Sequence, residues 1–273
     1  MPDAVDGLFG PFRSLKASFD LPTTSIYEGD LGDFVHASSH DLVWDLKAIE
    51  QLLKHKEVAR IADLGCGGGR VSKALAGNSP EAAIYGLDSQ AAYREPYERS
   101  LGGRGQGTFH VGDLLAPWPF AELDAAVLGN LSVQCISSIE DLDAFMRCAH
   151  RALRPGGQLV IIAVLQESLT FFTERPESMD AVAFERKDGS RSLVWRGMRY
   201  EAPHIWEMYF IEKRDSESWP GALGVSLGRV WTSQEVTERA GLSGFVVGTE
   251  VAVSVYADGE SELKCSAMSL IRI

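Results

Sequence analysis

The stretch from Arg60 to Val71, with the sequence RIADLGCGGGRV, constrains the fold of this chain more than any other. Its pattern predicts a short buried strand, a glycine-rich turn and then a helix that begins near Val71. Gly65, Gly67 and Gly69 occupy alternate positions of the turn, where glycine tolerates positive φ and lets a ligand approach the backbone. The following helix offers free N–H groups and the positive end of its dipole. The stretch therefore predicts a nucleotide-like ligand site in an α/β fold.

Further motifs follow this turn in order. Asp63 and the three glycines form D-x-G-x-G-x-G, which resembles the first motif of class I S-adenosylmethionine-dependent methyltransferases. Asp88 ends a second apolar strand, where an acid can accept hydrogen bonds from ribose hydroxyls. Asp113 follows a third strand, and in this family such an acid accepts from the adenine amino group. The turn L-R-P-G-G from Leu153 to Gly157, ahead of a fifth strand, is similar to another motif of the family.

The resemblance implies a Rossmann-like α/β fold. It predicts a seven-stranded sheet in the order 3-2-1-4-5-7-6, with the seventh strand antiparallel and helices on both faces. It also implies S-adenosyl-L-methionine as the cofactor. The expected cofactor contacts are Asp63, Gly65, Cys66, Gly67, Asp88, Ser89, Asp113, Leu114, Asn130 and Tyr27.

Four segments are expected. Residues 57–165 would form the cofactor-binding core, and residues 231–273 would complete it with a helix and the last two strands. Residues 1–56 would form a helical lid or cap that includes one helix from Asp41 to His55, with Ser39 as its N-cap. Residues 166–230 alternate apolar and polar side chains, which predicts an antiparallel β insertion after the fifth strand. This insertion resembles the substrate lid of small-molecule methyltransferases.

The lid supplies the candidates for substrate binding and proton removal. Trp195 and Trp206, together with His36 from the N-terminal segment, are expected to contact the substrate. His204 is the leading general-base candidate because an unperturbed imidazole titrates near neutral pH. Tyr200 is the second catalytic candidate. Glu201, Glu207 and His40 remain alternative candidates for the general base. Trp195, Tyr200 and Trp206 could instead belong to the apolar core of the lid.

Composition excludes several classes of function. The chain has 273 residues and a formal net charge of −12, which opposes a general nucleic-acid or membrane-surface binder. Its four cysteines are widely spaced, so neither a disulfide framework nor a zinc site is predicted. The N-terminus resembles no secretory signal, and no apolar run reaches membrane-spanning length. We therefore expect a cytoplasmic enzyme with a small-molecule substrate, no metal, and a possible homodimer or higher homo-oligomer.

The predicted reaction is methyl transfer from S-adenosylmethionine to an O, N or C nucleophile of a small apolar or aromatic metabolite. Two alternatives remain open: methylation coupled to cyclisation or rearrangement of a natural-product scaffold, and a non-catalytic scaffold protein of the same fold. Methylation of nucleic acid is a third possibility. The net charge opposes it, and Gly129–Ser132 reads Gly-Asn-Leu-Ser where many amino-methylating nucleic-acid enzymes have D/N-P-P-Y.

Overall fold

The computed structural model describes residues 8–54, 58–102, 107–186, 188–201, 205–214, 221–256 and 262–273. The chain divides into two compact units, a core unit and a β unit. The core unit comprises His40–Phe171 and Arg229–Ile273. The β unit comprises Met1–Ser39 and Phe172–Gly228, so the N-terminal residues join the insertion after the fifth core strand.

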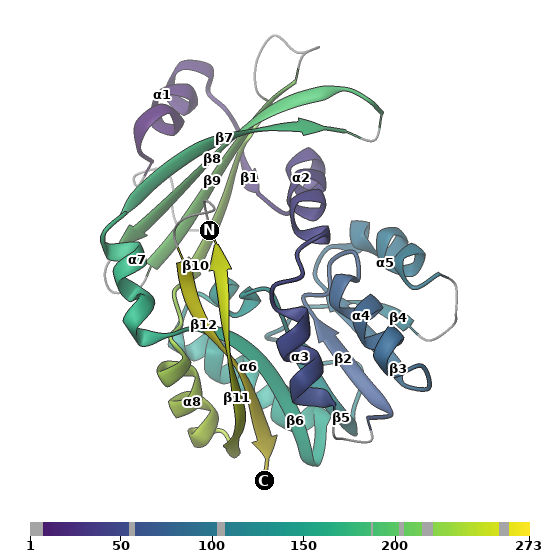
Figure 1. The fold of residues 1–273 in the computed structure, drawn as a ribbon. Coiled ribbons are helices and arrows are strands. Elements are labelled where there is room, and N and C mark those ends of the chain that lie inside the picture. Colours follow the sequence, from purple (N-terminus) through teal and green to yellow (C-terminus); the bar gives the residue numbers. More distant parts are fainter. Residues whose placement is uncertain are drawn as a thin grey trace. The chain divides into compact units, whose positions relative to one another are not determined.

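The core unit contains a seven-stranded sheet in the order β11-β12-β6-β5-β2-β3-β4 (Figure 1). Its strands are β2 (Arg60–Leu64), β3 (Ala83–Asp88), β4 (Gly107–Val111), β5 (Leu123–Leu128), β6 (Leu153–Val164), β11 (Phe245–Tyr256) and β12 (Glu262–Arg272). When the seven strands are numbered 1 to 7 along the chain and read from β4, this order is 3-2-1-4-5-7-6. β12 pairs antiparallel with β6. The predicted sheet topology is therefore confirmed.

Helices cover both faces of this sheet. They are α3 (Leu46–Leu53), α4 (Arg70–Asn78), α5 (Arg94–Ser100), α6 (Ile139–Ala152) and α8 (Ser233–Leu242), with 3-10 turns η1 (Ala91–Tyr93), η2 (Ser132–Cys135) and η3 (Gln166–Ser168). Figure 1 shows α3 in front of the sheet and α6 behind it. A large apolar cluster lies between the sheet and α6, and it includes fully buried Leu128, Phe145 and Ile161. Burial of these side chains removes apolar surface from water and fixes the strands that end at the candidate site.

The helix predicted from Asp41 to His55 is wrong at its start. In the structure α2 (Gly29–His40) ends before this stretch and α3 begins only at Leu46. Arg70 explains the interruption, because its side chain hydrogen-bonds the carbonyl of Leu42 at 2.8 Å. Ser39 lies within α2 and donates to the carbonyl of His36 at 3.1 Å, so it is not an N-cap.

The β unit is built on a five-stranded sheet in the order β1-β10-β9-β8-β7. Its elements are α1 (Gly10–Phe19), β1 (Thr23–Ser25), α2, α7 (Leu169–Thr173, at the junction with the core unit), β7 (Glu177–Glu185), β8 (Arg191–Glu201), β9 (Ile205–Arg214) and β10 (Leu223–Arg229). The strands from β7 to β9 pair antiparallel, which confirms the β insertion. The parallel pairing of β1 with β10, by contrast, links segments about two hundred residues apart and was not predicted.

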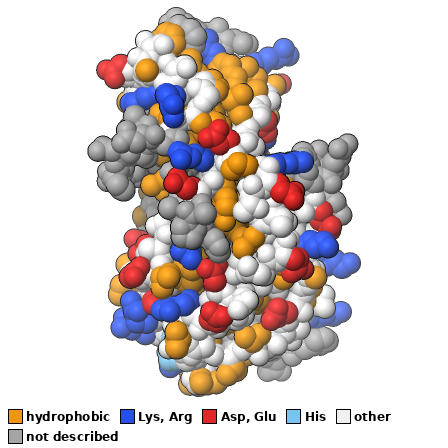
Figure 2. Space-filling model, turned by 90° about the vertical axis from the view of Figure 1, so that its left-hand side faces the viewer, with side chains coloured by type: hydrophobic (Ala, Val, Ile, Leu, Met, Phe, Trp, Pro, Cys, Tyr) orange, Lys and Arg blue, Asp and Glu red, His pale blue; other side chains and the backbone are white. Residues whose placement is uncertain are grey.

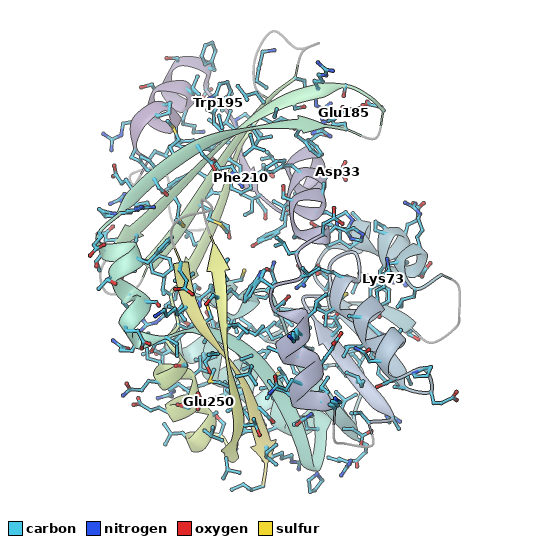
Figure 3. All side chains as sticks on the ribbon, in the orientation of Figure 1. Asp33, Lys73, Glu185, Trp195, Phe210 and Glu250 are labelled. Carbon is cyan, nitrogen blue, oxygen red and sulfur yellow. The ribbon has the colours of Figure 1, made fainter. Side chains whose placement is uncertain are left out.

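Two helices pack on opposite faces of the β-unit sheet. Phe12 of α1 lies against Gly197 and joins a cluster with Tyr209. On the other face, Phe34 of α2 packs against Phe184 and Phe210, with ring centroids 5.4 and 5.8 Å apart. Figure 3 shows Trp195 on the side of α1 and Phe210 on the side of α2, as the alternation of side chains along paired strands requires.

Candidate active site

Five parallel strands of the core unit, β2 to β6, end at one edge of its sheet. β2 pairs in parallel with β3 and β5, and β3 pairs in parallel with β4. Open α/β sheets bind ligands outside the carboxyl ends of such strands. The structure brings together at this edge the predicted residues Asp63, Gly65, Cys66, Gly67, Asp88, Ser89, Asp113, Leu114 and Asn130. Tyr27 belongs to the β unit.

The glycine turn leaves room for a ligand. Gly65, Gly67 and Gly69 have φ values of 62°, 48° and 86°, which favour glycine. A Cβ on Gly67 would meet no atom within 4 Å, and one on Gly65 would meet only Ser132, at 3.9 Å. A Cβ on Gly69 would lie 2.5 Å from the hydroxyl of Ser100 on α5. The first two glycines therefore border open space, whereas the third permits close helix packing.

Asp88 connects the end of β3 to the glycine turn. Its Oδ2 accepts the Gly67 N–H at 2.8 Å, and its Oδ1 accepts the Gln90 N–H at 2.9 Å. Desolvation raises the pKa of this half-buried carboxyl, and the backbone hydrogen bonds from Gln90 and Gly67 oppose that rise. The backbone of Ser89 also hydrogen-bonds this carboxyl, and the three backbone donors leave part of its acceptor capacity unused. Asp88 can therefore hold the turn and still accept hydrogen bonds from a ligand's hydroxyls.

Asp63 acts on α4. Its side chain is almost fully buried, and its Oδ2 accepts both the backbone N–H and the hydroxyl of Ser72, at 2.8 and 2.7 Å. Desolvation raises the pKa of Asp63 to about 6, although these hydrogen bonds lower it. The carboxylate therefore fixes the first turn of α4 behind the glycine turn.

The other predicted contacts differ in exposure. Cys66 is buried with Sγ near Gly86, and desolvation raises the pKa of its thiol. Leu114 is half-buried and packs against the main apolar cluster. Ser89 and Asp113 are exposed, and Asp113 Oδ1 accepts the Leu115 N–H at 2.9 Å.

A buried ion pair at this edge was missed by the sequence analysis. Arg70, the first residue of α4, binds Asp45 through two hydrogen bonds of 2.5 and 2.7 Å. The backbone N–H of Asn130 donates to Asp45 Oδ2 at 2.8 Å. A charged residue directly after the glycine turn could have indicated a need for a partner. No pattern around Asp45 identifies it as that partner.

The remaining predicted residues lie in the β unit. Tyr27 and His36 are half-buried, and Tyr27 packs against the cluster around Phe34. Trp195 packs against the cluster beneath α1. His204 lies outside the described residues, as does the side chain of Trp206, whose backbone belongs to β9.

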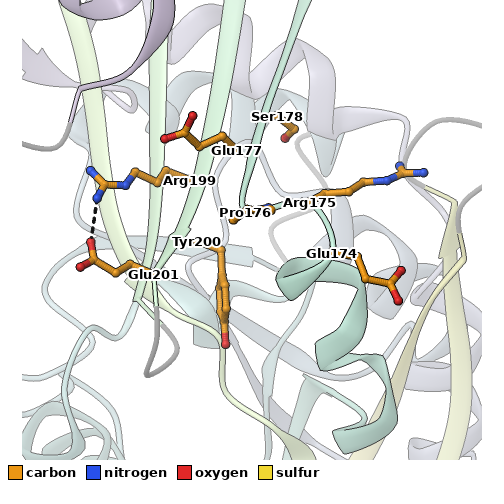
Figure 4. A pocket seen from close by; sticks show the side chains of 8 residues that line it. All are labelled: Glu174, Arg175, Pro176, Glu177, Ser178, Arg199, Tyr200 and Glu201. Atoms are coloured by element: carbon orange, nitrogen blue, oxygen red, sulfur yellow. Dashed lines mark hydrogen bonds and ion pairs between the residues drawn. The ribbon is translucent and has the colours of Figure 1, made fainter.

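Tyr200 lies beside a charged pocket of the β unit. The pocket has a volume of about 440 Å³ and is lined by Glu174, Arg175, Pro176, Glu177, Ser178, Arg199, Tyr200 and Glu201. Figure 4 shows Arg199 and Glu201 on one side of β8, joined by an ion pair of 2.9 Å, and Tyr200 directed to the other. The Tyr200 ring is largely buried, with its centroid 5.6 Å from that of Phe172. This lining offers a ligand charges and one aromatic ring.

The described part of the chain contains no group of three or more His, Cys, Asp or Glu side chains that could hold a metal ion. Within the same residues, no helix is long and apolar enough to cross a membrane.

Part of the core unit is similar to known methyltransferases. A family model described as a methyltransferase domain matches residues 61–157. Ribosomal RNA large subunit methyltransferase G of Streptomyces avermitilis is 38% identical over 109 residues, which cover 38% of this chain and 28% of that protein. Trans-aconitate 2-methyltransferase of Variovorax paradoxus is 30% identical over 105 residues, 38% of each chain. The chain thus spans between 28% and 42% of the length of these and similar curated relatives.

Solved structures extend the likeness to most of the chain. An S-adenosylmethionine-dependent methyltransferase from Clostridium acetobutylicum matches with a TM-score of 0.68 and 12% identity, over 90% of this chain and 100% of that one. A sugar N-methyltransferase from Streptoalloteichus matches with a TM-score of 0.66 and 16% identity, over 91% and 96%. At such identities the likeness establishes the fold alone, which is the class I methyltransferase fold with an added β sheet.

Proposed function

Residues 61–157 belong to the methyltransferase-domain family, and on this premise we propose that the chain transfers a methyl group from S-adenosylmethionine to a small molecule. The observation that carries the proposal is the open glycine turn tied to Asp88 by the 2.8 Å hydrogen bond from Gly67. The cofactor would supply an electrophilic methyl group on its sulfonium. The protein's part is to bind the cofactor, exclude water and align the acceptor atom.

The proposed roles follow the order of the strand ends. The backbone at Gly65 and Gly67 would lie against the cofactor, since no side chain occupies that space. Asp88 would accept hydrogen bonds from the ribose hydroxyls through its remaining lone pairs. Asp113, exposed beyond β4, would accept from the adenine amino group. Asn130, at the end of β5, would lie near the methionine end.

A small-molecule acceptor is favoured by the charge of the chain. The net charge of −12 opposes binding to RNA phosphates. On the face shown in Figure 2, Lys and Arg side chains are interspersed with Asp and Glu, without a continuous basic patch among the coloured residues. The matches to the ribosomal RNA methyltransferase and to trans-aconitate 2-methyltransferase each cover 38% of this chain and do not separate the two kinds of acceptor. Structural neighbours over most of the chain include a sugar N-methyltransferase and an amino pentose methyltransferase.

The acceptor would be recognised by the β unit. We assign substrate contacts to His36, Trp195 and Trp206, and proton removal to His204 or Tyr200. The charged pocket beside Tyr200 favours a polar acceptor over a purely apolar one. A cytoplasmic location and a homo-oligomeric state stay predictions from the sequence.

Transfer of a labelled methyl group tests this function. The protein would be incubated with methyl-labelled S-adenosylmethionine and, in separate reactions, with amino sugars, phenols, carboxylic acids or purified ribosomal RNA. We expect label in a small molecule whose mass increases by one methyl group in place of hydrogen, and none with Asp88→Ala. Label in RNA alone would refute the small-molecule assignment. A product with a rearranged skeleton would favour coupled cyclisation, and cofactor binding without any transfer would favour a scaffold.

A further inference from the structure

A fully buried carboxylate links three segments at the candidate site. Asp45 lies in the turn before α3 and is 0% exposed, whereas the Arg70 side chain is 12% exposed. The Arg70 guanidinium binds both Asp45 oxygens and also donates to the carbonyl of Leu42. Asp45 Oδ2 accepts, in addition, the backbone N–H of Asn130. The start of α4 and the end of β5 are thus held by the same side chain.

The segment that Asp45 holds has an unfavourable backbone conformation. Asn130 and Leu131 have φ values of 50° and 57°, in the left-handed region that L side chains rarely adopt. Asparagine tolerates this region better than leucine does. Two consecutive residues in it persist only when the surrounding structure holds them there, and such conformations concentrate at functional sites. The hydrogen bond from Asn130 to Asp45 is one such restraint, and that from Ser132 N–H to the Gly129 carbonyl, at 2.9 Å, is another.

Gly129 allows the close approach. A Cβ at this position would lie 3.1 Å from Asp45 Oδ2 and 3.2 Å from Cγ2 of Val71. Contacts this short are tighter than most Cβ contacts, so the Asp45 carboxylate, Val71 or the strand end would have to move by a few tenths of an ångström. Ser132 in turn lies 3.9 Å from where a Cβ on Gly65 would be. The exit of β5 is therefore packed between the buried ion pair and the glycine turn.

We propose that Asp45 and Arg70 are positioning residues, which hold Gly129–Ser132 in its left-handed conformation and thereby set the affinity of the site for an adenosyl ligand. The Arg70 guanidinium balances the charge of the buried Asp45 side chain, whose Oδ2 accepts the Asn130 N–H. Neither residue touches the reacting atoms in this account. The effect on the affinity for an adenosyl ligand rests on the proposed function. The restraint on the conformation of Gly129–Ser132 does not.

Two measurements on the full chain test these claims separately. Amide hydrogen exchange reports on the restraint of the loop, and calorimetry reports on ligand affinity. The variants are Asp45→Asn, Arg70→Lys, which keeps the charge beside Asp45, and Asp124→Asn as the matched control. Asp124 also binds an arginine, Arg154, and two backbone N–H groups, but at the opposite end of β5. S-Adenosylhomocysteine is the ligand probe.

We expect Asp45→Asn to speed exchange at the Asn130 amide at least tenfold and to raise the Kd for S-adenosylhomocysteine at least tenfold. Arg70→Lys keeps the charge but loses the paired hydrogen bonds to both Asp45 oxygens, so it should change both quantities in the same direction by a smaller factor than Asp45→Asn, whereas Asp124→Asn should change both by less than about threefold. Gly129→Ala, which adds a Cβ 3.1 Å from Asp45 Oδ2 and so crowds the contact between the strand end and the carboxylate, should also speed exchange at Asn130. This second variant keeps the test decisive if Asp45→Asn does not fold.

Several outcomes would overturn the inference. Exchange at Asn130 that is unchanged in both Asp45→Asn and Gly129→Ala would contradict the loop restraint. Faster exchange spread evenly over the chain would show that the pair acts only on global stability. A wild-type protein that does not bind S-adenosylhomocysteine would refute the proposed function, whereas normal binding by a loosened Asp45→Asn loop would refute the inference and leave that function standing.

Discussion

Ser72 donates two hydrogen bonds to one oxygen of Asp63, from its backbone nitrogen at 2.8 Å and from its hydroxyl at 2.7 Å. These bonds tie the first turn of α4 to the end of β2. They do not fully offset desolvation, which raises the pKa of Asp63 from 3.8 to about 6. The acid of the glycine motif is thus a structural link whose ionisation costs stability.

The free energy of unfolding of the protein should depend on pH through the ionisation of Asp63. Because its pKa is higher in the folded state, the folded protein binds this proton more tightly, and the free energy of unfolding falls as pH rises from about 4 to about 6. A shift of this size corresponds to about 3 kcal/mol. Urea unfolding across this pH range measures it. Asp63→Asn lacks the titration, so its free energy of unfolding should rise, relative to wild type, by about this amount across the window.

Asp124 provides a control of opposite sign. Desolvation raises the pKa of its carboxyl, but hydrogen bonds from Arg154 and from the backbone of Ala59 and Arg60 lower it below its usual value. The stabilising contribution of the ionised Asp124 is therefore lost as pH falls. Asp124→Asn should thus be less stable than wild type mainly above about pH 4, and the difference should shrink at lower pH. Parallel pH curves for wild type and Asp63→Asn would contradict the account of Asp63.

The capping box at the start of α8 should contribute to stability without affecting the site. Thr232 accepts the Glu235 N–H at 3.2 Å, and Glu235 Oε2 accepts the Thr232 N–H at 3.0 Å. Thr232→Val keeps the shape and removes the hydroxyl, so we expect a loss of about 1–2 kcal/mol by urea unfolding. Ser138→Ala removes the single cap bond of α6 and should cost no more than that. Weaker binding of S-adenosylhomocysteine by Thr232→Val would show a wider role for the box.

The β unit depends on a buried ion pair of its own. The side chains of Arg186 and Glu212 are 9% and 7% exposed and hydrogen-bond at 2.9 Å. Glu212→Gln would leave the buried guanidinium with the exposed carboxylates of Asp30 and Asp33, 3.2 and 3.8 Å away, so we expect a cost of about 1.5–3 kcal/mol from the weakened charged hydrogen bonds. Limited proteolysis should then cut within residues 172–228 faster than in wild type. Arg196→Gln breaks the exposed pair with Asp180 and should change stability by at most about 1 kcal/mol. Equal protease sensitivity of the two variants would contradict this assignment.

The predicted parts of the fold were those encoded by local patterns. The glycine turn and Asp88 lie within one strand-turn-helix-strand segment, and the resemblance supplied the strand order that the structure confirms. Asp45 was missed because its partners lie 25 and 85 residues away in sequence. The same contacts explain the wrong helix start, since apolar periodicity cannot reveal that Arg70 holds Leu42 outside a helix.

Longer-range features of the β unit were equally hidden. β1 consists of only three residues, and its sequence does not indicate that it pairs with β10. Trp195 and Tyr200 were selected as aromatic residues of a lid, and in the structure both pack against other aromatic or apolar side chains. Sequence alone could not separate packing from ligand contact for these residues, because both favour large amphipathic rings.

The central claim is that the carboxyl edge of the core sheet binds an adenosyl cofactor through the glycine turn and Asp88. Calorimetric titration of S-adenosylmethionine and S-adenosylhomocysteine into the full chain tests it most directly, with Asp88→Ala as the disrupted site and Asp124→Asn as the control. We predict one-to-one binding by wild type and the control. Asp88→Ala should bind at least about tenfold more weakly, because it loses charge-assisted hydrogen bonds. Absence of binding by wild type, or equal affinity for Asp88→Ala, would contradict the account.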